Sequence, residues 1–278
     1  METKMSKITT LQKAVETIEN GSTVAIGGNV LHRAPMALVR EIVRQKKRDL
    51  AVVKTAGAMD VDVLCFAGCV RSVDAGFISY ETKHSLANHY RKAVQEGIVR
   101  ANEHACYTVI SALRAAQAGV PFMPVRGLMV SDLIERNAYF TKIQDPFGYG
   151  EVTVVKAIAP DYALIHVQEA DEDGNAVIDE PVFEDVLMAK ASKNVILSAE
   201  KIVSNQRLRR VPERVRIPHF LVGAVVPVEY GAKPCSCFPQ YPYSEKEVER
   251  FKALKELKEL DEWLSGYESA DYMQRGWY

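Results

Sequence analysis

Short apolar runs alternate with amphipathic helical stretches along the first half of the chain, and this alternation limits the possible folds more than any other feature. The strand-like runs are 23–26, 50–56, 73–79 and 122–125. Apolar residues at helical spacing predict helices over 11–18, 38–43, 61–66, 82–95 and 107–118. This pattern predicts a three-layer α/β fold, with a mostly parallel sheet and helices on both faces.

The second half of the chain continues with strands and fewer helices. Strands are predicted over 153–158, 162–168, 194–198 and 220–228, and a helix over 184–192. The acidic segment 171–175 predicts a solvated β-turn, because its glycine comes too early for a calcium loop and no glutamate closes it. Ser244 and Glu247 form a capping box for a final helical segment at about 244–265. Because no linker or repeat interrupts the sequence, we expect a single domain over 1–278.

Composition excludes several classes of protein. Lys and Arg number 35 against 36 Asp and Glu, so a net charge of −1 does not favour a nucleic-acid partner. No apolar run is long enough for a membrane span, and residues 1–10 lack the apolar core of a secretory signal, so we expect a cytoplasmic protein. Cys65 and Cys69 lie among apolar residues and are expected to be buried thiols. Cys235 and Cys237 lack a second ligand pair, so no metal site is predicted.

The segment Gly27-Gly28-Asn29 is the most informative for chemistry. It directly follows a predicted strand and leads towards a helix that begins near Pro35. Two glycines let the backbone approach a ligand, and their amides can stabilise developing negative charge. The spacing matches neither a Walker loop nor a dinucleotide fingerprint. The residues alone therefore leave two interpretations open, an anion-binding loop and a tight structural turn.

Asn20-Gly21, the apolar run that follows, Gly27-Gly28 and Pro35 together resemble the N-terminal signature of family I CoA-transferases, in the branch of the glutaconate CoA-transferase A (alpha) subunit. Asn29 stands where the signature usually has phenylalanine, and Arg33 stands where it has glycine. The resemblance continues through 119–125, 161–168, 173–175 and 228–234.

This resemblance implies an α subunit that pairs with a similarly folded β subunit. The nucleophilic glutamate would come from the β subunit and attack an acyl-CoA in a ping-pong exchange with a carboxylic acid. Coenzyme A would be part of the substrate and not a permanently bound cofactor. This chain would supply the loop Gly27, Gly28 and Asn29, whose amides would stabilise the oxyanion.

Two glutamates are candidate catalytic residues. Glu81 ends a predicted strand where related α subunits carry Gly-Glu-Asn, although Tyr80 and Thr82 flank it here. It could take part in chemistry, lie at the subunit interface, or supply negative charge to a helix N-terminus. Glu103 lies near the position where relatives place an acidic residue that faces the cleft.

His32 and Arg33 are candidate substrate-binding residues. Either could contact a substrate carboxylate, with Arg33 as a bidentate donor, but a loop histidine facing solvent or the subunit interface is equally consistent with the residues. His166 lies in an apolar strand and is expected to be a core or interface histidine. The basic run 207–216 is expected to be a solvated face, with a CoA phosphate contact as the alternative.

Two other functions remain open at this point. A branch of the family that hydrolyses a ring bond in cyclic-diketone CoA thioesters during steroid degradation would use an acidic residue near Glu103 as a base. A sugar-phosphate isomerase-like binder would use the glycine loop for an anion. No nucleophile and base pair is evident, so the chain is expected to need a second subunit. Its C-terminal aromatic residues would cover that interface or pack in the core: Trp263, Tyr267, Tyr272 and Trp277.

Overall fold

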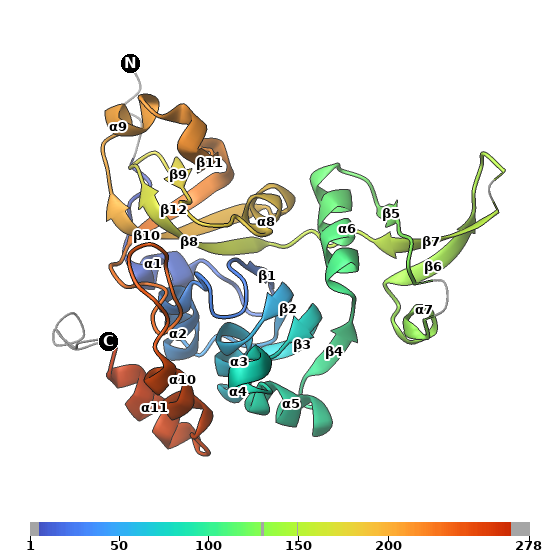
Figure 1. The fold of residues 1–278 in the computed structure, drawn as a ribbon, viewed down its shortest axis with the longest axis horizontal. Coiled ribbons are helices and arrows are strands. Elements are labelled where there is room, and N and C mark those ends of the chain that lie inside the picture. The colour runs from blue at the N-terminus through green and yellow to red at the C-terminus, as the bar shows by residue number, and fades with distance from the viewer. Residues whose placement is uncertain (1–5, 129–130, 149, 268–278) are drawn as a thin grey trace.

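The computed structural model describes residues 6–128, 131–148 and 150–267 (Figure 1). Its main sheet contains seven parallel strands in the order β12-β10-β8-β1-β2-β3-β4. These strands are β1 (Thr23–Ile26), β2 (Leu50–Gly57), β3 (Val70–Ile78), β4 (Arg100–Glu103), β8 (Tyr162–Ala170), β10 (Asn194–Ile202) and β12 (Val222–Pro227). Two short antiparallel strands, β9 (Ala176–Val177) and β11 (Val215–Ile217), extend the end of β8. The predicted α/β fold with a mostly parallel sheet is confirmed.

Helices cover both faces of this sheet and create two hydrophobic cores. One core includes residues of α1 (Leu11–Glu16), α2 (Met36–Arg44), α3 (Met59–Phe66), α5 (Asn88–Gln95), α10 (Glu245–Lys252) and α11 (Leu257–Ser265). The other includes residues of α6 (Cys106–Gln117) and α8 (Asp185–Ala191). Successive strand residues enter opposite cores, as Ala163 and Leu164 do, because side chains alternate across a strand. Burial on both faces explains the apolar runs in β1, β8, β10 and β12.

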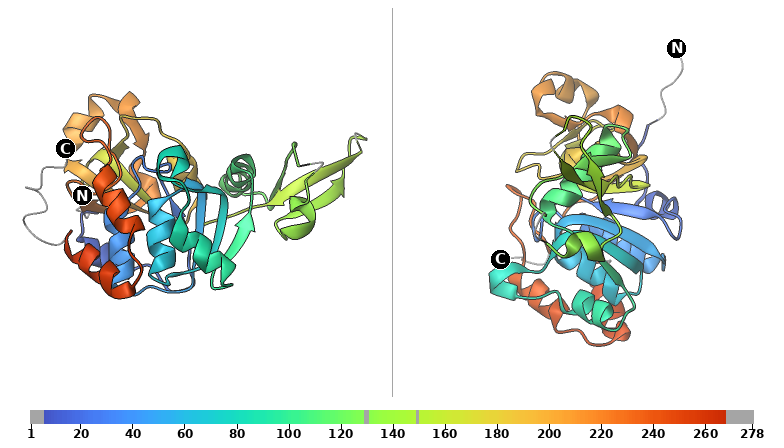
Figure 2. Two further views of the ribbon diagram at one scale, coloured as in Figure 1. Left: turned by 60° about the horizontal axis from the view of Figure 1, so that its bottom comes forward. Right: turned by 90° about the vertical axis from the view of Figure 1, so that its right-hand side faces the viewer.

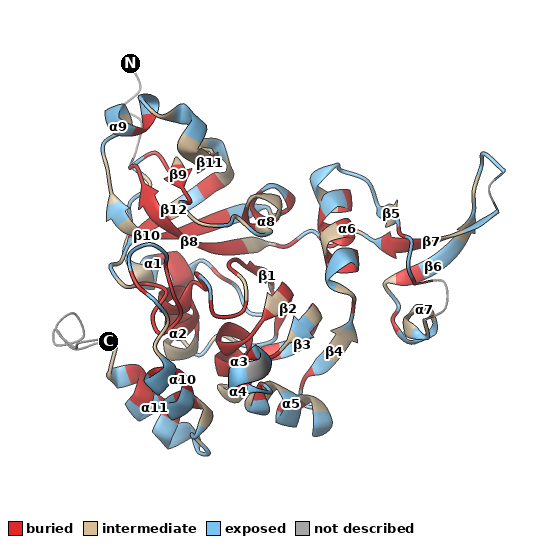
Figure 3. Cartoon of the chain, in the orientation of Figure 1, coloured by how far each residue is buried: buried red, intermediate tan, exposed pale blue. Residues whose placement is uncertain are grey.

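A small antiparallel sheet extends from the main body beside α6 (Figures 1 and 2). Its strands lie in the order β5 (Phe122–Pro124), β7 (Glu151–Lys156) and β6 (Phe140–Gln144). The short helix α7 (Leu133–Arg136) contacts β6. The predicted runs 122–125 and 153–158 therefore do not join the parallel sheet. They pair locally and antiparallel, and much of this arm is exposed (Figure 3). Four strands carry no clear signal in the sequence because they are short or partly exposed: β4, β6, β9 and β11.

Two predicted helices are each divided into two. The segment 82–95 forms α4 (Glu81–His84) and α5, because Ser85 has a φ of +62° and its carbonyl accepts the amide of Tyr80. The C-terminal segment forms α10 and α11, and the turn between them brings the rings of Phe251 and Trp263 to 5.3 Å. Ser244 caps α10 as predicted. Trp263 is therefore a core residue, whereas Tyr272 and Trp277 lie outside the described residues.

Smaller elements complete the second half. They are α9 (Asn205–Arg209) and the 3-10 turns Pro212–Arg214 and His219–Leu221. The prediction that the acidic turn at 171–175 is solvated is wrong. Asp171 is buried, and its Oδ1 accepts the amides of Asp173, Gly174 and Asn175. One carboxylate thus satisfies the polar groups of the turn. In the basic run, Arg207 and Arg214 pair with Glu169 and Asp179 at 2.6 Å.

None of the helices described has both the length and the apolar character needed to cross a bilayer. Cys65 and Cys69 are buried thiols in the first core, as predicted. Cys235 and Cys237 are buried as well, and all five cysteines are free thiols.

Candidate active site

The carboxyl ends of the parallel strands bring the predicted site residues to one edge of the sheet. Gly27 directly follows β1, Glu81 follows β3 and Glu103 ends β4. A bridge between Val30 and Gly57 joins the glycine loop to the end of β2. Ligands of open α/β sheets bind at this edge. The structure therefore places the glycine loop and both candidate glutamates along the same side of the molecule.

The peptide bond between Gly27 and Gly28 is held at both of its polar ends. The Gly27 carbonyl oxygen accepts a 2.5 Å hydrogen bond from Lys54 Nζ, and the Gly28 amide donates to Asp185 Oδ1 at 2.9 Å. The Lys54 and Asp185 side chains are both fully buried. Because the C=O and N–H of a trans peptide point in opposite directions, these two bonds fix the orientation of the peptide plane.

Each of these two charged side chains has a buried counter-ion. Lys54 Nζ lies 2.8 Å from Asp60 Oδ2, and Asp60 Oδ1 accepts the amides of Ala58 and Val61. Asp185 Oδ2 lies 2.7 Å from Arg33 Nη2. Buried charges are tolerated only when they are paired and hydrogen-bonded, as these are.

The other amides of the glycine loop also donate within the chain. Gly27 donates to Leu164, Asn29 to His32 and Val30 to Ala56, at 2.8 to 3.0 Å. The oxyanion role of Gly27, Gly28 and Asn29 therefore stays a prediction, and it would require one of these amides to be released. Close packing explains the glycines independently: a Cβ at Gly28, whose φ is +71°, would collide with the backbone of His32 and Arg33.

Arg33 is fully buried and anchors the loop. Its guanidinium donates to the carbonyls of His166 and Pro181, and it pairs with Asp185 and with Glu180 at 2.9 Å. Burial alone would lower the pKa of Arg33, but the carboxylates of Asp185 and Glu180 outweigh it and raise the pKa. With these partners, the guanidinium does not face a substrate carboxylate in this structure, and such a contact stays a prediction.

His32 is exposed and lies beside Ser236, which sequence reasoning missed. Its Nδ1 is 3.1 Å from Ser236 Oγ, and that hydroxyl donates its proton to the carbonyl of Leu31. With the Ser236 hydroxyl donating to Leu31, the ring tautomer that completes this contact carries its proton on Nδ1. The two residues are 204 positions apart, so no local sequence signal could have linked them.

Glu81 is exposed and has a φ of +62°, unusual for a residue with a side chain. The residue before it, Tyr80, is buried and donates from its hydroxyl to Asp62 Oδ2 at 3.0 Å. Burial raises the pKa of Asp62 to about 6, against hydrogen bonds from Tyr90 and Tyr80 that lower it. The Tyr80–Asp62 contact thus fixes the backbone from which Glu81 projects.

Glu103 is exposed at the end of β4, where the arm meets the main sheet. Its backbone carbonyl accepts from Asn137 Nδ2 at 2.7 Å, which ties the arm to this strand. The next residue, His104, is buried between Asp74 at 3.4 Å and Thr108 at 3.3 Å. The Glu103 side chain therefore projects from a backbone that is held on both sides.

A second polar group that sequence reasoning missed joins three distant segments. Thr55 Oγ1 donates to Glu184 Oε2 at 2.6 Å, and Cys106 Sγ donates to the Thr55 carbonyl at 3.3 Å. Burial and the nearby Glu184 carboxylate raise the pKa of Cys106. Its thiol is therefore protonated at neutral pH and is a poor nucleophile.

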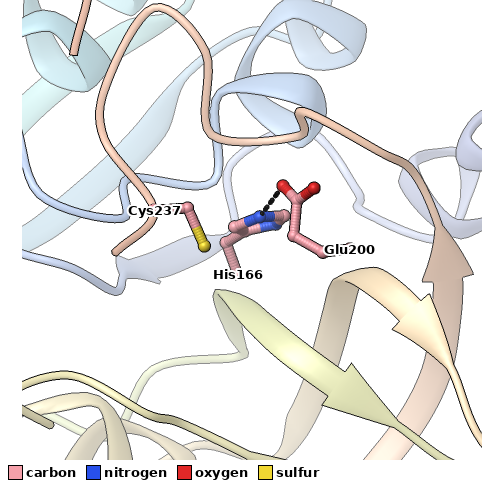
Figure 4. A group of neighbouring side chains, drawn as sticks. All are labelled: His166, Glu200 and Cys237. Atoms are coloured by element: carbon pink, nitrogen blue, oxygen red, sulfur yellow. Dashed lines mark hydrogen bonds and ion pairs between the residues drawn. The ribbon is translucent and has the colours of Figure 1, made fainter. Parts of the chain in front are cut away.

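His166, Glu200 and Cys237 bring three potential metal-ligating atoms within 4.8 Å of one another (Figure 4). The imidazole already bonds Ser198 Oγ at 2.8 Å and Glu200 Oε1 at 2.7 Å. Glu200 also accepts the hydroxyl of Tyr241 and the amides of Tyr230 and Gly231. Burial would raise the pKa of Glu200, but the hydrogen bond to His166 helps to lower it. His166 is thus the satisfied core histidine predicted from its apolar strand.

Comparison with known proteins decides the family. The family described as Coenzyme A transferase matches residues 8–227. The chain belongs to this family. Among the two-subunit CoA-transferases it corresponds to the A component, since it is 30% identical to that component of glutaconate CoA-transferase from Acidaminococcus fermentans, over 92% of this chain and 85% of that protein. The crystal structure of glutaconate CoA-transferase from the same organism superposes with a TM-score of 0.88 at 29% identity, over 94% of this chain and 88% of that one.

Two further relatives of this chain differ from the glutaconate enzyme in length or in named reaction. A protein of Archaeoglobus fulgidus is 35% identical over 87% of this chain, which spans only 54% of its length. The cholesterol ring-cleaving hydrolase IpdA subunit of Rhodococcus jostii is 33% identical, over 84% of this chain and 81% of that protein. Proteins similar to this chain therefore include both a named CoA-transferase subunit and a named hydrolase subunit.

Proposed function

We propose that this chain works with a β subunit to move coenzyme A between an acyl-CoA and a carboxylic acid, and that the β subunit provides the nucleophilic glutamate. The observation that supports it most is that the candidate site at the carboxyl edge of the sheet lacks a nucleophile paired with a base among the described residues. Glu81 and Glu103 present exposed carboxylates there, and within the described chain neither has a hydrogen-bonded base or nucleophile beside it. The partner is therefore needed to complete the reacting groups.

The proposed reaction runs through covalent intermediates on the partner's glutamate. Its carboxylate attacks the thioester carbonyl, the CoA thiolate leaves, and an acyl-glutamyl anhydride forms. The thiolate then attacks the glutamyl carbonyl and releases the first acid, which leaves a glutamyl-CoA thioester. The acceptor acid then attacks the glutamyl-CoA thioester and displaces the CoA thiolate, which gives a second anhydride. The thiolate attacks the acyl carbonyl of that anhydride, which releases the new acyl-CoA and the free glutamate. This chain would form one wall of the cavity with its rigid glycine loop and exclude water from the anhydride.

An assay of each chain and of their mixture tests this proposal. The β-subunit chain is co-expressed, the complex is isolated by gel filtration, and exchange between an acyl-CoA and a labelled acid is followed. We expect exchange only from the complex. Full exchange from this chain alone would overturn the proposal, because the nucleophile would then have to lie within it.

Hydrolysis of a carbon–carbon bond is the second candidate. The exposed Glu103 favours it, since no group in the described part of the chain engages its carboxylate, which leaves it available as a general base. Glu103→Gln separates the two functions: it should lower hydrolysis by roughly a hundredfold or more and leave CoA exchange nearly unchanged. A sugar-phosphate binder has less support, because the amides from Gly27 to Val30 are all bonded within the chain.

We further propose a cytoplasmic location, which suits five cysteines that are all free thiols. Coenzyme A would enter as part of the acyl-CoA substrate, and the proposed steps use no resident cofactor.

A further inference from the structure

A cavity of about 620 Å³ opens beside His32, next to the glycine loop. Three segments far apart in the sequence form it: the loop at His32, residues 180–183 before α8, and residues 236–243 after β12. Hydrogen bonds join the first and third of these, since the Arg33 amide donates to Ser236 and the Ser236 amide donates to Leu31. The cavity is thus built onto the same loop as the candidate active site, and its volume suits a small organic ligand.

The walls of the cavity are mainly aromatic and apolar. Phe183 and Phe238 remain 38% and 65% exposed, and Tyr241 and Tyr243 also line the cavity. Tyr241 offers only its ring, because its hydroxyl is bonded to Glu200 and to the Ala232 amide. Phe183 is held at a φ of +47°, a strained conformation for a bulky residue, with its ring 6.5 Å from that of His32. Exposed aromatic rings around a cavity favour an apolar occupant.

The charges around the cavity disfavour a second carboxylate on the ligand. Among the described lining residues, only His32 can become a cation, and the Glu180 carboxylate is already paired with the buried Arg33 at 2.9 Å. Arg33 and Lys233 lie behind the wall with their side chains buried and bonded to backbone carbonyls, Arg33 to those of His166 and Pro181 and Lys233 to that of Pro242. The Arg33 guanidinium is already engaged by Glu180 and Asp185, so among the described lining residues only His32 could receive the distal charge of a dicarboxylic acyl group.

We propose that this cavity binds the acyl group of the thioester and of the acceptor acid, and that it selects an uncharged ring or branched apolar group over a dicarboxylic one. The inference rests on the proposed CoA exchange and names its substrate class. His32, at the mouth of the cavity, would lie between the apolar pocket and the reacting carbonyl. The acyl tail would extend away from the glycine loop towards Phe183 and Phe238.

Steady-state exchange by the two-subunit complex tests the proposal, with cyclohexanecarboxyl-CoA and glutaryl-CoA as the two donors. We expect kcat/KM to favour the ring by at least about tenfold. Phe238→Ala should lower kcat/KM for the ring donor by roughly tenfold, mainly through KM, and should lower it much less for acetyl-CoA, whose methyl group is too short to fill the cavity. Phe220→Ala is the matched control, because Phe220 is 73% exposed and outside the cavity.

A gain of function gives an independent arm. Gln240→Lys places a cation at the cavity and should shift the preference towards glutaryl-CoA, whereas Gln117→Lys on the exposed side of α6 should not. A wild-type preference for glutaryl-CoA, or a Phe238→Ala complex whose ring preference is intact, would overturn the proposal. A Phe238→Ala variant that no longer binds the β subunit would also overturn it, because that result would assign the cavity to the subunit interface.

Failure of the proposed function is distinguishable from failure of this inference. If the complex exchanges none of the three thioesters, the proposed function fails. Calorimetric titration of the complex with cyclohexanecarboxylate and glutarate then tests whether the cavity prefers the apolar acid. Tighter binding of cyclohexanecarboxylate that weakens in Phe238→Ala supports the cavity assignment. Equal or absent binding of both acids overturns it.

Discussion

Lys54 and Asp185 hold opposite ends of one peptide bond, the bond between Gly27 and Gly28. Lys54 lies within β2 and Asp185 begins α8, so the two partners come from distant parts of the chain. Each is paired with a buried counter-ion, Asp60 for Lys54 and Arg33 for Asp185. The loop that faces the candidate active site is thus rigid because charged groups fix its backbone. Its glycines leave room for Asp185 beside Gly27 and for the backbone of His32 and Arg33 beside Gly28.

Lys54→Met should destabilise the fold strongly. It removes the cation from a fully buried pair and leaves Asp60 charged among apolar neighbours, which costs about 3–5 kcal/mol. Urea unfolding measures the loss. The double variant Lys54→Met/Asp60→Asn should recover part of it, because an asparagine oxygen can still accept the amides of Ala58 and Val61 without a buried charge. A double variant less stable than the single one would contradict this account.

Gly28→Ala should be far more damaging than Gly21→Ala, although both glycines have positive φ. A Cβ at Gly21 meets nothing within 4 Å, so that variant should lose only about 1–2 kcal/mol of backbone strain. A Cβ at Gly28 would lie 2.6 Å from the Arg33 carbonyl carbon, and the loop would have to move. We expect a loss of about 3 kcal/mol or more in thermal or urea unfolding, together with loss of exchange activity. Similar losses in the two variants would show that the loop is looser than described.

Asp62→Asn should change how stability depends on pH. The carboxyl has a pKa of about 6 in the folded protein against 3.8 for an ordinary aspartate, so the native state binds the extra proton. Its contribution is fully present below about pH 3.8 and is lost as the pH rises through 6. Relative to the variant, the wild type should therefore lose up to about 3 kcal/mol between pH 4 and pH 7.5. Urea unfolding of both proteins at the two pH values checks this.

An Asp62→Asn variant whose stability differs from wild type by the same amount at both pH values would refute that assignment. Asparagine can retain both contacts of the group, by accepting the Tyr90 amide and donating to the Tyr80 hydroxyl. The comparison therefore isolates the charge. Because the asparagine keeps the contact with Tyr80, the backbone that carries Glu81 should be unchanged. KM for the thioester should therefore stay the same at neutral pH.

Removal of metal ions should leave the protein unaffected. His166 and Glu200 use their polar atoms in bonds to Ser198, to each other, to Tyr241 and to backbone amides, and burial keeps the Cys237 thiol protonated by raising its pKa. We expect the melting temperature and exchange activity to survive dialysis against EDTA, and added Zn²⁺ to give no stabilisation. A rise in melting temperature with stoichiometric Zn²⁺ would show that this group is a metal site.

For the glycine loop, the sequence predicts its position in the fold but not the groups that contact it. The position of Gly27 and Gly28 after a strand was evident from the β-branched run before them, and the paired glycines indicated close backbone approach. What approaches them was not evident, because Lys54 and Asp185 are 27 and 157 residues away from the groups they bind. Arg33 was a candidate for contact with a substrate carboxylate, and its burial depends on Glu180 and Asp185, which no local pattern connects to it.

The sequence by itself determined the parallel α/β sheet, the two apolar faces of its strands and the burial of His166, since periodicity and local composition encode which side chains leave water. Only the tertiary structure decided the separate arm, the break at Ser85, the contact between His32 and Ser236 and the aromatic cavity beside them. Those features depend on which distant segments meet, and the free energy of such contacts exists only once the chain has folded. Local propensity, which acts over a few residues, carries no record of them.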